Sequence, residues 1–216
     1  MRYGLIVFDW DGTLLDSAGG IVECIQEAAR DLRLPVPARE MASHVIGLGL
    51  HDSLRMAVPT LPEENYKEFA EAYRRHFLAR QGMMALFPGV RELLRDLQAG
   101  GHRLAVATGK SRRGLDQALE STALRRLFAA TRCADETNPK PHPAMLLELM
   151  AQLAAKPGQV LMIGDTSHDL EMARSAGVDA VAVAYGAHPD AALRALAPRA
   201  CVTNVPELRE WLAANA

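Results

Sequence analysis

The chain has 216 residues, of which 49% are hydrophobic and 23% are charged, and its formal net charge is −2. This composition allows a sizeable core and argues against disorder, and the near-neutral charge argues against a nucleic-acid-binding protein with a basic face. The three cysteines are far apart and form no CxxC or His/Cys cluster, so neither a disulfide framework nor a zinc site is indicated.

The first predicted element is a short strand, Leu5–Phe8, in which every residue is apolar. An apolar run without polar alternation is typical of a strand that is covered on both faces, as in a parallel sheet. Asp9 and Asp11 end the run after too few residues for a signal peptide, and no apolar stretch reaches the ~20 residues of a membrane span. We therefore expect a cytoplasmic protein that does not enter the membrane.

Helical periodicity follows, from Ser17 to Arg80. Apolar residues three and four apart predict a helix that begins near Ser17, with Asp16 or Ser17 as its N-cap. Further helical patterns cover residues 41–46, 50–58 and 63–80, and no strand is predicted among them. Gly47 and Gly49 interrupt this block and predict a flexible loop that can reach a site on the rest of the protein.

Strands and helices alternate from Pro88 onward. The predicted strands lie at residues 103–109, 129–134, 160–163, 180–184 and near Cys201, and the helices between and after them lie at 90–97, 113–124, 143–153, 169–176 and 206–213. Such alternation is the signature of βαβ units. The predicted fold class is α/β: a doubly wound, parallel-sheet, Rossmann-like core of residues 1–15 and 84–216, with an all-helical cap, residues 16–83, inserted after the first strand.

Charged and hydroxyl residues follow three of the predicted strands. In an open α/β sheet, ligands bind outside the carboxyl ends of the strands, so we expect these residues to meet at one edge. The segment NPKPHP adds Lys140, held between two prolines, to the same region. The residues at the strand ends are Asp9, Asp11, Gly12, Thr13, Thr108, Gly109, Lys110, Asp165 and Asp169.

This set of residues has the chemistry of a magnesium and phosphate site. Gathered carboxylates raise one another's pKa unless a cation is present, and Mg²⁺ takes oxygen ligands such as those of Asp9 and Asp165. Each residue also has an ordinary interpretation: Asp and Gly favour turns, Thr108 can cap a helix, Lys140 can be a solvated loop cation, and acidic residues stabilise helix N-termini. Their joint occurrence in this order favours the site.

Four segments in this order resemble the haloacid dehalogenase superfamily of phosphatases, across nearly the whole chain. They are FDWDGTLLDS at 8–17, VATGK at 106–110, NPKPHP around Lys140, and GDTSHD at 164–169. The helical insert between the first two segments resembles members with a small helical cap, and among these the phosphoglycolate-phosphatase-like branch.

The resemblance implies a role for each matching residue. Asp9 would be the nucleophile that forms an aspartyl-phosphate, and Asp11 would protonate the leaving oxygen and then activate water. Mg²⁺ would be held by Asp9, Asp165 and the backbone carbonyl of Asp11. Asp169 would orient the metal's water shell or Lys140 from the second layer. The residues implied to bind the phosphoryl group are Gly12, Thr13, Thr108, Gly109 and Lys140.

The cap is expected to select the substrate. Gly47, His51 and Arg55 are candidates for contacting it, with Arg74 and Arg75, although a solvated helix face is the ordinary interpretation of each cation. His142 and His168 flank the motifs without a role that the chemistry requires.

These observations predict a Mg²⁺-dependent phosphatase that acts on a small phosphorylated metabolite. A phosphomutase or a pyrophosphatase of the same family is an alternative. From a different class, a receiver-like switch also uses a phosphorylated Asp with a Thr and a Lys around Mg²⁺, but such domains are shorter and a helical insert does not suit them. The resemblance implies a small anionic, phosphoglycolate-like substrate, with a sugar phosphate or pyrophosphate as alternatives. The oligomeric state is open.

Overall fold

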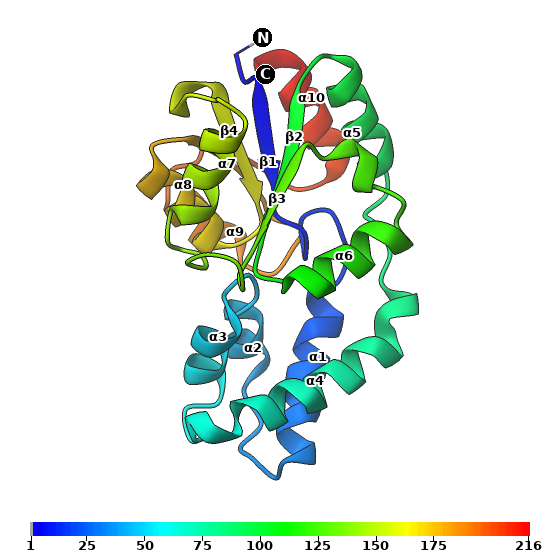
Figure 1. Cartoon of the computed structure of the whole chain (residues 1–216), viewed down its shortest axis with the longest axis vertical. Coiled ribbons are helices and arrows are strands. Elements are labelled where there is room, and N and C mark those ends of the chain that lie inside the picture. The colour runs from blue at the N-terminus through cyan, green and yellow to red at the C-terminus, as the bar shows by residue number, and fades with distance from the viewer. Residues whose placement is uncertain (1) are drawn as a thin grey trace.

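A computed structural model describes residues 2–216, and its centre is one six-stranded sheet with the strand order β3-β2-β1-β4-β5-β6 (Figure 1). Every neighbouring pair is parallel, which confirms the predicted α/β fold class. The strands are β1 (Leu5–Phe8), β2 (Arg103–Thr108), β3 (Ala130–Cys133), β4 (Val160–Gly164), β5 (Asp179–Val183) and β6 (Ala200–Val202).

Helices cover both faces of this sheet. Alternate residues of β1 face opposite ways: Ile6 and Phe8 pack with α5, α6 and α10, whereas Leu5 and Val7 pack with α7 and α8. The fully apolar sequence of β1 thus reflects burial on both faces. The helices of the core are α5 (Val90–Ala99), α6 (Arg112–Ser121), α7 (Ala144–Gln152), α8 (Ser167–Ala176), α9 (Asp190–Arg194) and α10 (Val205–Asn215), with short 3₁₀ turns η3 (Arg125–Leu127) and η4 (Pro157–Gln159).

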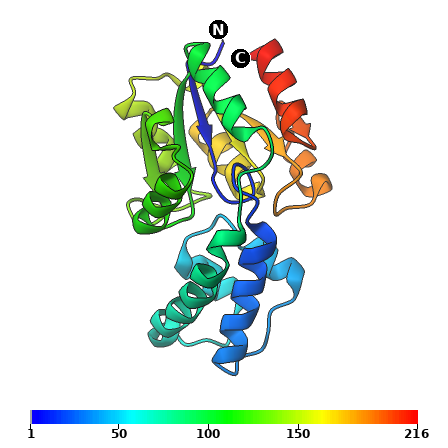
Figure 2. The same ribbon diagram turned by 90° about the vertical axis from the view of Figure 1, so that its right-hand side faces the viewer.

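The helices between β1 and α5 lie together beyond the carboxyl ends of the strands, and we call them the cap (Figures 1 and 2). They are α1 (Ala18–Asp31), α2 (Arg39–His44), α3 (Leu50–Ala57) and α4 (Tyr66–Arg80), with 3₁₀ turns η1 (Glu63–Asn65) and η2 (Gln81–Met83). The cap has a hydrophobic cluster of its own, which includes Ile21, Leu54 and Phe69. We retain residues 16–83 as the proposed extent of the cap.

The chain enters and leaves the cap through two adjacent segments. The backbone N–H of Asp16 donates to the carbonyl of Ala85 at 2.8 Å, and that of Phe87 donates to the carbonyl of Leu14 at 3.0 Å. Leu15 forms an isolated bridge with Leu86. These contacts tie the two crossings together, so the chain passes between core and cap through one narrow connection.

Two details differ from the sequence-based expectation. Ser17 occupies the N-cap position of α1, but its hydroxyl makes no capping bond and donates instead to Asp11 Oδ1 at 2.7 Å. Helix α9 was not expected, because five residues are too few to show helical periodicity.

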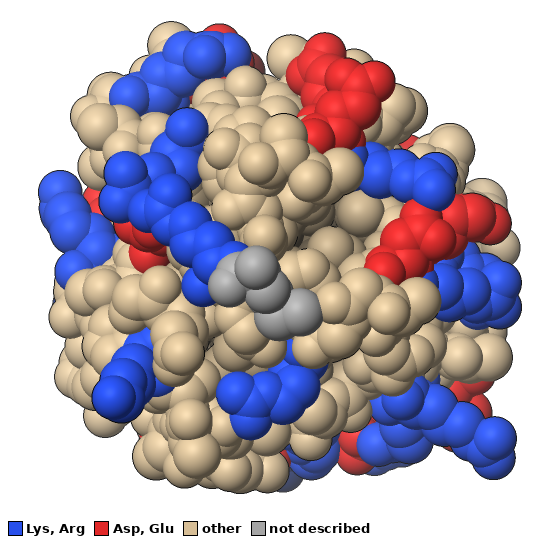
Figure 3. Space-filling model, turned by 90° about the horizontal axis from the view of Figure 1, so that it is seen from above, with Lys and Arg blue, Asp and Glu red and all other residues tan. Residues whose placement is uncertain are grey.

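One end of the molecule, shown in Figure 3, carries more basic than acidic side chains, scattered among uncharged ones. Within residues 2–216, no helix combines the length and the apolar character that a membrane span requires.

Candidate active site

Three carboxylates meet in the interior at the carboxyl ends of β1 and β4. Asp9, Asp165 and Asp169 are almost completely buried, and each offers an oxygen within 4.8 Å of the others. The adjacent pairing of β1 with β4 places Asp9 beside Asp165, and the backbone N–H of Asp9 donates to the carbonyl of Ile163 at 2.9 Å. The structure therefore brings these predicted site residues together.

Asp165 and Asp169 are held by hydrogen bonds. Asp165 accepts the hydroxyl of Thr13 and the backbone N–H of Ala187, both at 2.7 Å. Asp169 Oδ2 accepts the hydroxyl of Thr166 at 2.7 Å and its N–H at 3.1 Å, which forms a capping box at the start of α8. Both side chains are thus fixed in orientation.

Gly12 packs directly against Asp165. Its φ of +79° lies in the left-handed region, and a Cβ placed on it would lie 2.1 Å from Asp165 Oδ2. Any side chain at residue 12 would displace this carboxylate, which explains the glycine of the DWDGT segment.

Lys140 lies between two of the carboxylates and is fully buried. Its Nζ is 2.8 Å from Asp9 Oδ1 and 2.6 Å from Asp169 Oδ1, which makes an ion pair with each. Neither oxygen of Asp9 accepts a hydrogen bond from the described residues, and Oδ2 also lacks an ion-pair partner.

The charges of this cluster do not balance. Burial, with smaller contributions from Asp169 and Asp11, raises the pKa of Asp9 to about 7 against the opposing effect of Lys140. Burial, together with the charges of Asp9 and Asp169, raises the pKa of Asp165 well above its usual range. Burial alone would lower the pKa of Lys140, but Asp169 and Asp9 hold it above its usual value.

A hard cation fits this donor set. The cluster offers carboxylate oxygens only, carries three acidic groups against one ammonium group, and leaves Asp9 Oδ2 free to bind. Asp9, whose Oδ2 has no partner among the described residues, and the neighbouring Asp165 are the side chains that could hold Mg²⁺.

Asp11 lies nearer the surface of the site and has two partners that the sequence did not reveal. Ser17 donates to its Oδ1 at 2.7 Å, and Lys110 Nζ lies 2.9 and 2.7 Å from its two oxygens. Thr108, at the end of β2, is buried and its hydroxyl oxygen accepts the N–H of Lys110 at 3.2 Å. Its O–H proton therefore remains available as a donor.

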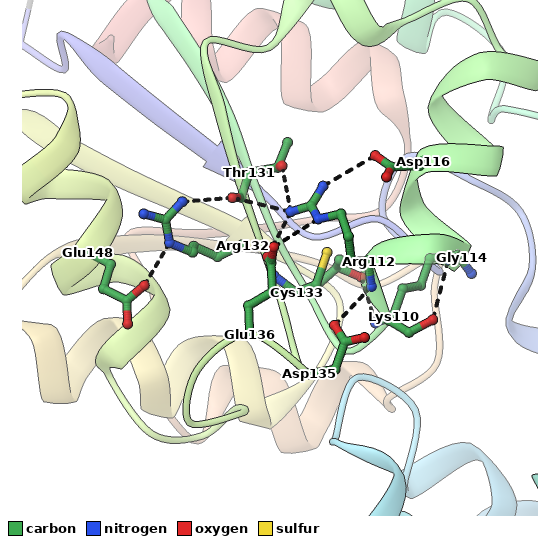
Figure 4. Close-up of polar contacts among 12 residues, drawn as sticks. Lys110, Arg112, Gly114, Asp116, Thr131, Arg132, Cys133, Asp135, Glu136 and Glu148 are labelled. Carbon is green, nitrogen blue, oxygen red and sulfur yellow. Dashed lines mark hydrogen bonds and ion pairs between the residues drawn. The ribbon is translucent and has the colours of Figure 1, made fainter.

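An ion-pair network holds the segment that leads from β3 toward Lys140 (Figure 4). The guanidinium of Arg112 donates to both oxygens of Glu136 at 2.9 and 2.7 Å, and the backbone N–H of Arg112 donates to Asp135 at 2.8 Å. Arg112 begins α6, four residues after Thr108. The network thus ties together the two loops that carry Thr108 and Lys140.

The loop between α2 and α3 touches the core at the site, as its glycines suggested. A Cβ placed on Gly109 would lie 2.5 Å from the carbonyl oxygen of Gly47 and 2.8 Å from that of Leu48. The cap backbone therefore rests directly on the turn after β2, which only glycine allows.

Two core histidines hold the end of α2. His168 Nε2 lies 2.7 Å and His188 Nε2 lies 3.1 Å from the backbone carbonyl of His44. A carbonyl can only accept, so both nitrogens carry a proton. Burial lowers the pKa of both side chains, to about 4 for His188, which keeps them neutral. Nearby, Ser43 donates to the carbonyl of Ala187 at 2.7 Å.

A cavity of about 320 Å³ lies between the cap and the core and reaches Asp9, Asp11 and Thr108. Gly47 and Arg74 line it, as expected for cap residues that contact substrate. His51 and Arg55 do not.

Their side chains point elsewhere in this structure. His51 is exposed and lies 3.2 Å from Glu63, and Arg55 pairs with Asp52 one helical turn away. Arg75 likewise pairs with Asp31. Each of these three side chains is thus on a solvated helix face, the ordinary interpretation given above.

Comparisons with known proteins agree with this geometry. A family model described as "Haloacid dehalogenase-like hydrolase" matches residues 6–183. The chain is 37% identical over 210 residues to "Probable phosphatase IndB" of Dickeya dadantii, covering 94% of this chain and 91% of that protein. It is 30% identical over 209 residues to "Phosphoglycolate phosphatase" of Mannheimia succiniciproducens, covering 88% of this chain and 93% of the relative.

A third relative has a different name. "Tyrosine-protein kinase PtkA" of Mycobacterium tuberculosis is 36% identical over 185 residues, which cover 84% of this chain and 62% of that protein. Among solved structures, a hydrolase from Pseudomonas syringae superposes with a TM-score of 0.91 at 22% identity, over the full length of both chains. At that identity the structural match supports the fold alone.

Proposed function

This chain belongs to the haloacid dehalogenase-like hydrolases and is a phosphatase; on that premise we propose that it hydrolyses a small phosphorylated metabolite in a Mg²⁺-dependent reaction through phosphorylated Asp9. The observation that carries the proposal is the state of Asp9. Its carboxylate is buried at the end of β1, has a free oxygen, and borders the cavity.

In the first half of the reaction, a carboxylate oxygen of Asp9 attacks phosphorus and the bond from phosphorus to the leaving oxygen breaks. Asp11 also borders the cavity and donates its proton to that oxygen. In the second half, Asp11 takes a proton from water, the water oxygen attacks phosphorus, and the bond from phosphorus to the Asp9 oxygen breaks. The products are inorganic phosphate and free Asp9.

Positive charge around the phosphoryl group comes from Lys140, and the hydroxyl of Thr108 supplies a neutral donor. Mg²⁺, held by Asp9, Asp165 and the carbonyl of Asp11, would offset the remaining negative charge when bound. Asp169 keeps Lys140 in place through the 2.6 Å ion pair. The hydrogen bonds of Asp11 with Ser17 and Lys110 set its orientation toward the cavity.

The test is phosphate release from a panel of phosphate monoesters, measured with MgCl₂ and with EDTA, for the wild type and for Asp9→Asn. We expect metal-dependent release that disappears in the variant. Pyrophosphate and a sugar phosphate with its acceptor belong in the panel, to detect a pyrophosphatase or a mutase. ATP belongs there because one relative is named a kinase. Stable labelling by acetyl phosphate without turnover would instead indicate a switch protein.

A further inference from the structure

We propose that the substrate is a phosphate monoester whose alcohol carries an apolar ring or chain, which fills the cavity between the cap and the core. This inference rests on the proposed function and narrows its substrate class. It contrasts with a small anionic alcohol such as glycolate, the substrate type that the named branch suggests.

One face of α4 forms the cap side of this cavity. The residues of α4 and the turn after it that line the cavity are spaced three and four apart, which places them on one side of the helix. They are Phe69, Ala70, Tyr73, Arg74, Phe77, Leu78 and Gln81. Phe69 and Ala72 of the same helix are buried in the cap. Tyr73 and Phe77 also pack against the hydrophobic cluster of the cap, so the cavity is continuous with the apolar interior of the cap.

The rest of the cavity wall is also largely apolar. Ile21, Ile25 and Leu54 contribute from the other cap helices, and Met84 from the segment that leaves the cap. Specific ligand sites typically combine such a wall with a few placed polar groups. The volume of about 320 Å³ lies within the range of pockets that hold drug-sized molecules, and a phosphate with a two-carbon acid would leave much of it unfilled.

The cations of the lining are poorly placed for a second carboxylate. Lys110 Nζ is already paired with Asp11 at 2.7 Å and lies 4.7 Å from the centre of the Phe77 ring. Arg74 and Arg113 line the cavity but are exposed to solvent. An acidic leaving group in contact with the apolar part of the wall would lack a buried counter-charge, which is unfavourable.

Tyr73 offers the polar group that orients a ligand. Its hydroxyl makes no hydrogen bond with any of residues 2–216, and burial, followed by the charge of Asp11, raises its pKa well above the usual range. The hydroxyl therefore stays protonated and can donate to one acceptor on the substrate. Tyr73 and Phe77 stack with their ring centres 5.9 Å apart, which gives an aromatic wall suited to a planar group.

The test compares benzyl phosphate, ethyl phosphate and phosphoglycolate, whose leaving groups are all alkoxides and differ mainly in shape and charge. We expect kcat/KM for benzyl phosphate to exceed that of each of the other two by at least about 10-fold. In Phe77→Ala the benzyl-to-ethyl ratio should fall toward one. Ala70→Phe, which fills part of the cavity, should lower the same ratio, and it serves as the test if Phe77→Ala does not fold.

The matched control is Tyr66→Ala, an aromatic residue of the same helix that does not line the cavity. It should leave the ratio unchanged. A wild-type protein that prefers phosphoglycolate, or a ratio that neither cavity variant alters, would overturn this inference and leave the phosphatase assignment in place. Failure to release phosphate from any of the three esters, or from the wider panel, would overturn the proposed function itself.

Discussion

Replacing Gly109 with alanine should separate closure of the cap from stability of the fold. The added Cβ would lie 2.5 Å from the carbonyl oxygen of Gly47, 2.7 Å from its carbonyl carbon and 2.8 Å from the carbonyl oxygen of Leu48. These are backbone atoms, so no side-chain rotation relieves the contact. The loop between α2 and α3 must retreat from the site.

The size of the effect follows from the distance. Ordinary contact begins near 3.4 Å, so the loop must move by about 1 Å, a misplacement that can lower an enzymatic rate by on the order of 100-fold. That factor corresponds to about 2.7 kcal/mol in the activation free energy. Gly109 has no left-handed φ, so alanine restricts the unfolded chain and should change the free energy of unfolding by no more than about 1 kcal/mol.

The assay is kcat/KM on the best substrate of the panel, together with urea denaturation of the same preparations. Gly158→Ala is the control, because a Cβ there has nothing within 4 Å, and it should leave both quantities near wild type. Gly109→Ala with wild-type kcat/KM would refute the claim that the cap closes against this turn. A large loss of stability would show instead that the turn itself cannot accept a side chain.

Three further predictions concern the carboxylate cluster and the contact between cap and core. Asp9→Asn should abolish phosphate release and raise the melting temperature in EDTA, because it removes one of three buried, mutually repelling carboxylates; a lower melting temperature would contradict this. MgCl₂ should stabilise the wild type by about 2.7 kcal/mol at 100 times its Kd, and Asp165→Asn should lose most of that gain in a thermal melt. His168→Ala should cost about 1–3 kcal/mol in urea denaturation, because the carbonyl of His44 loses its shorter hydrogen bond, whereas the exposed His51→Ala should cost less than about 0.5 kcal/mol.

The fold was predictable because its signals are local. Apolar runs such as Leu5–Phe8 indicated strands buried on both faces, and the alternation after Pro88 indicated parallel pairing. The carboxylate cluster followed from the same logic, because adjacent parallel strands end at one edge and so bring Asp9 to Asp165.

The contacts that were missed all depend on how distant segments approach one another. Lys110 reaches Asp11 across 99 residues of sequence, and His168 and His188 reach His44 across 124 and 144 residues. Neither hydrophobic periodicity nor turn preference predicts a contact between residues so far apart in the sequence. His51 and Arg55, named as candidates for substrate contact, do not line the cavity, whereas Tyr73 and its neighbours do. Charge alone does not say which side of a cap helix faces the core.

The hydrogen bonds from His168 and His188 to the carbonyl of His44 have a consequence for the stability of the cap. This carbonyl belongs to the last turn of α2, and no backbone N–H of the described residues donates to it. Side chains of the core thus supply the hydrogen bonds at the C-terminal end of a cap helix. Separation of cap and core would expose that turn to water, and so short a helix has little tendency to persist alone. Opening of the site should therefore be coupled to fraying of α2. The hydrogen-exchange rate of the α2 amides should report how often the site opens.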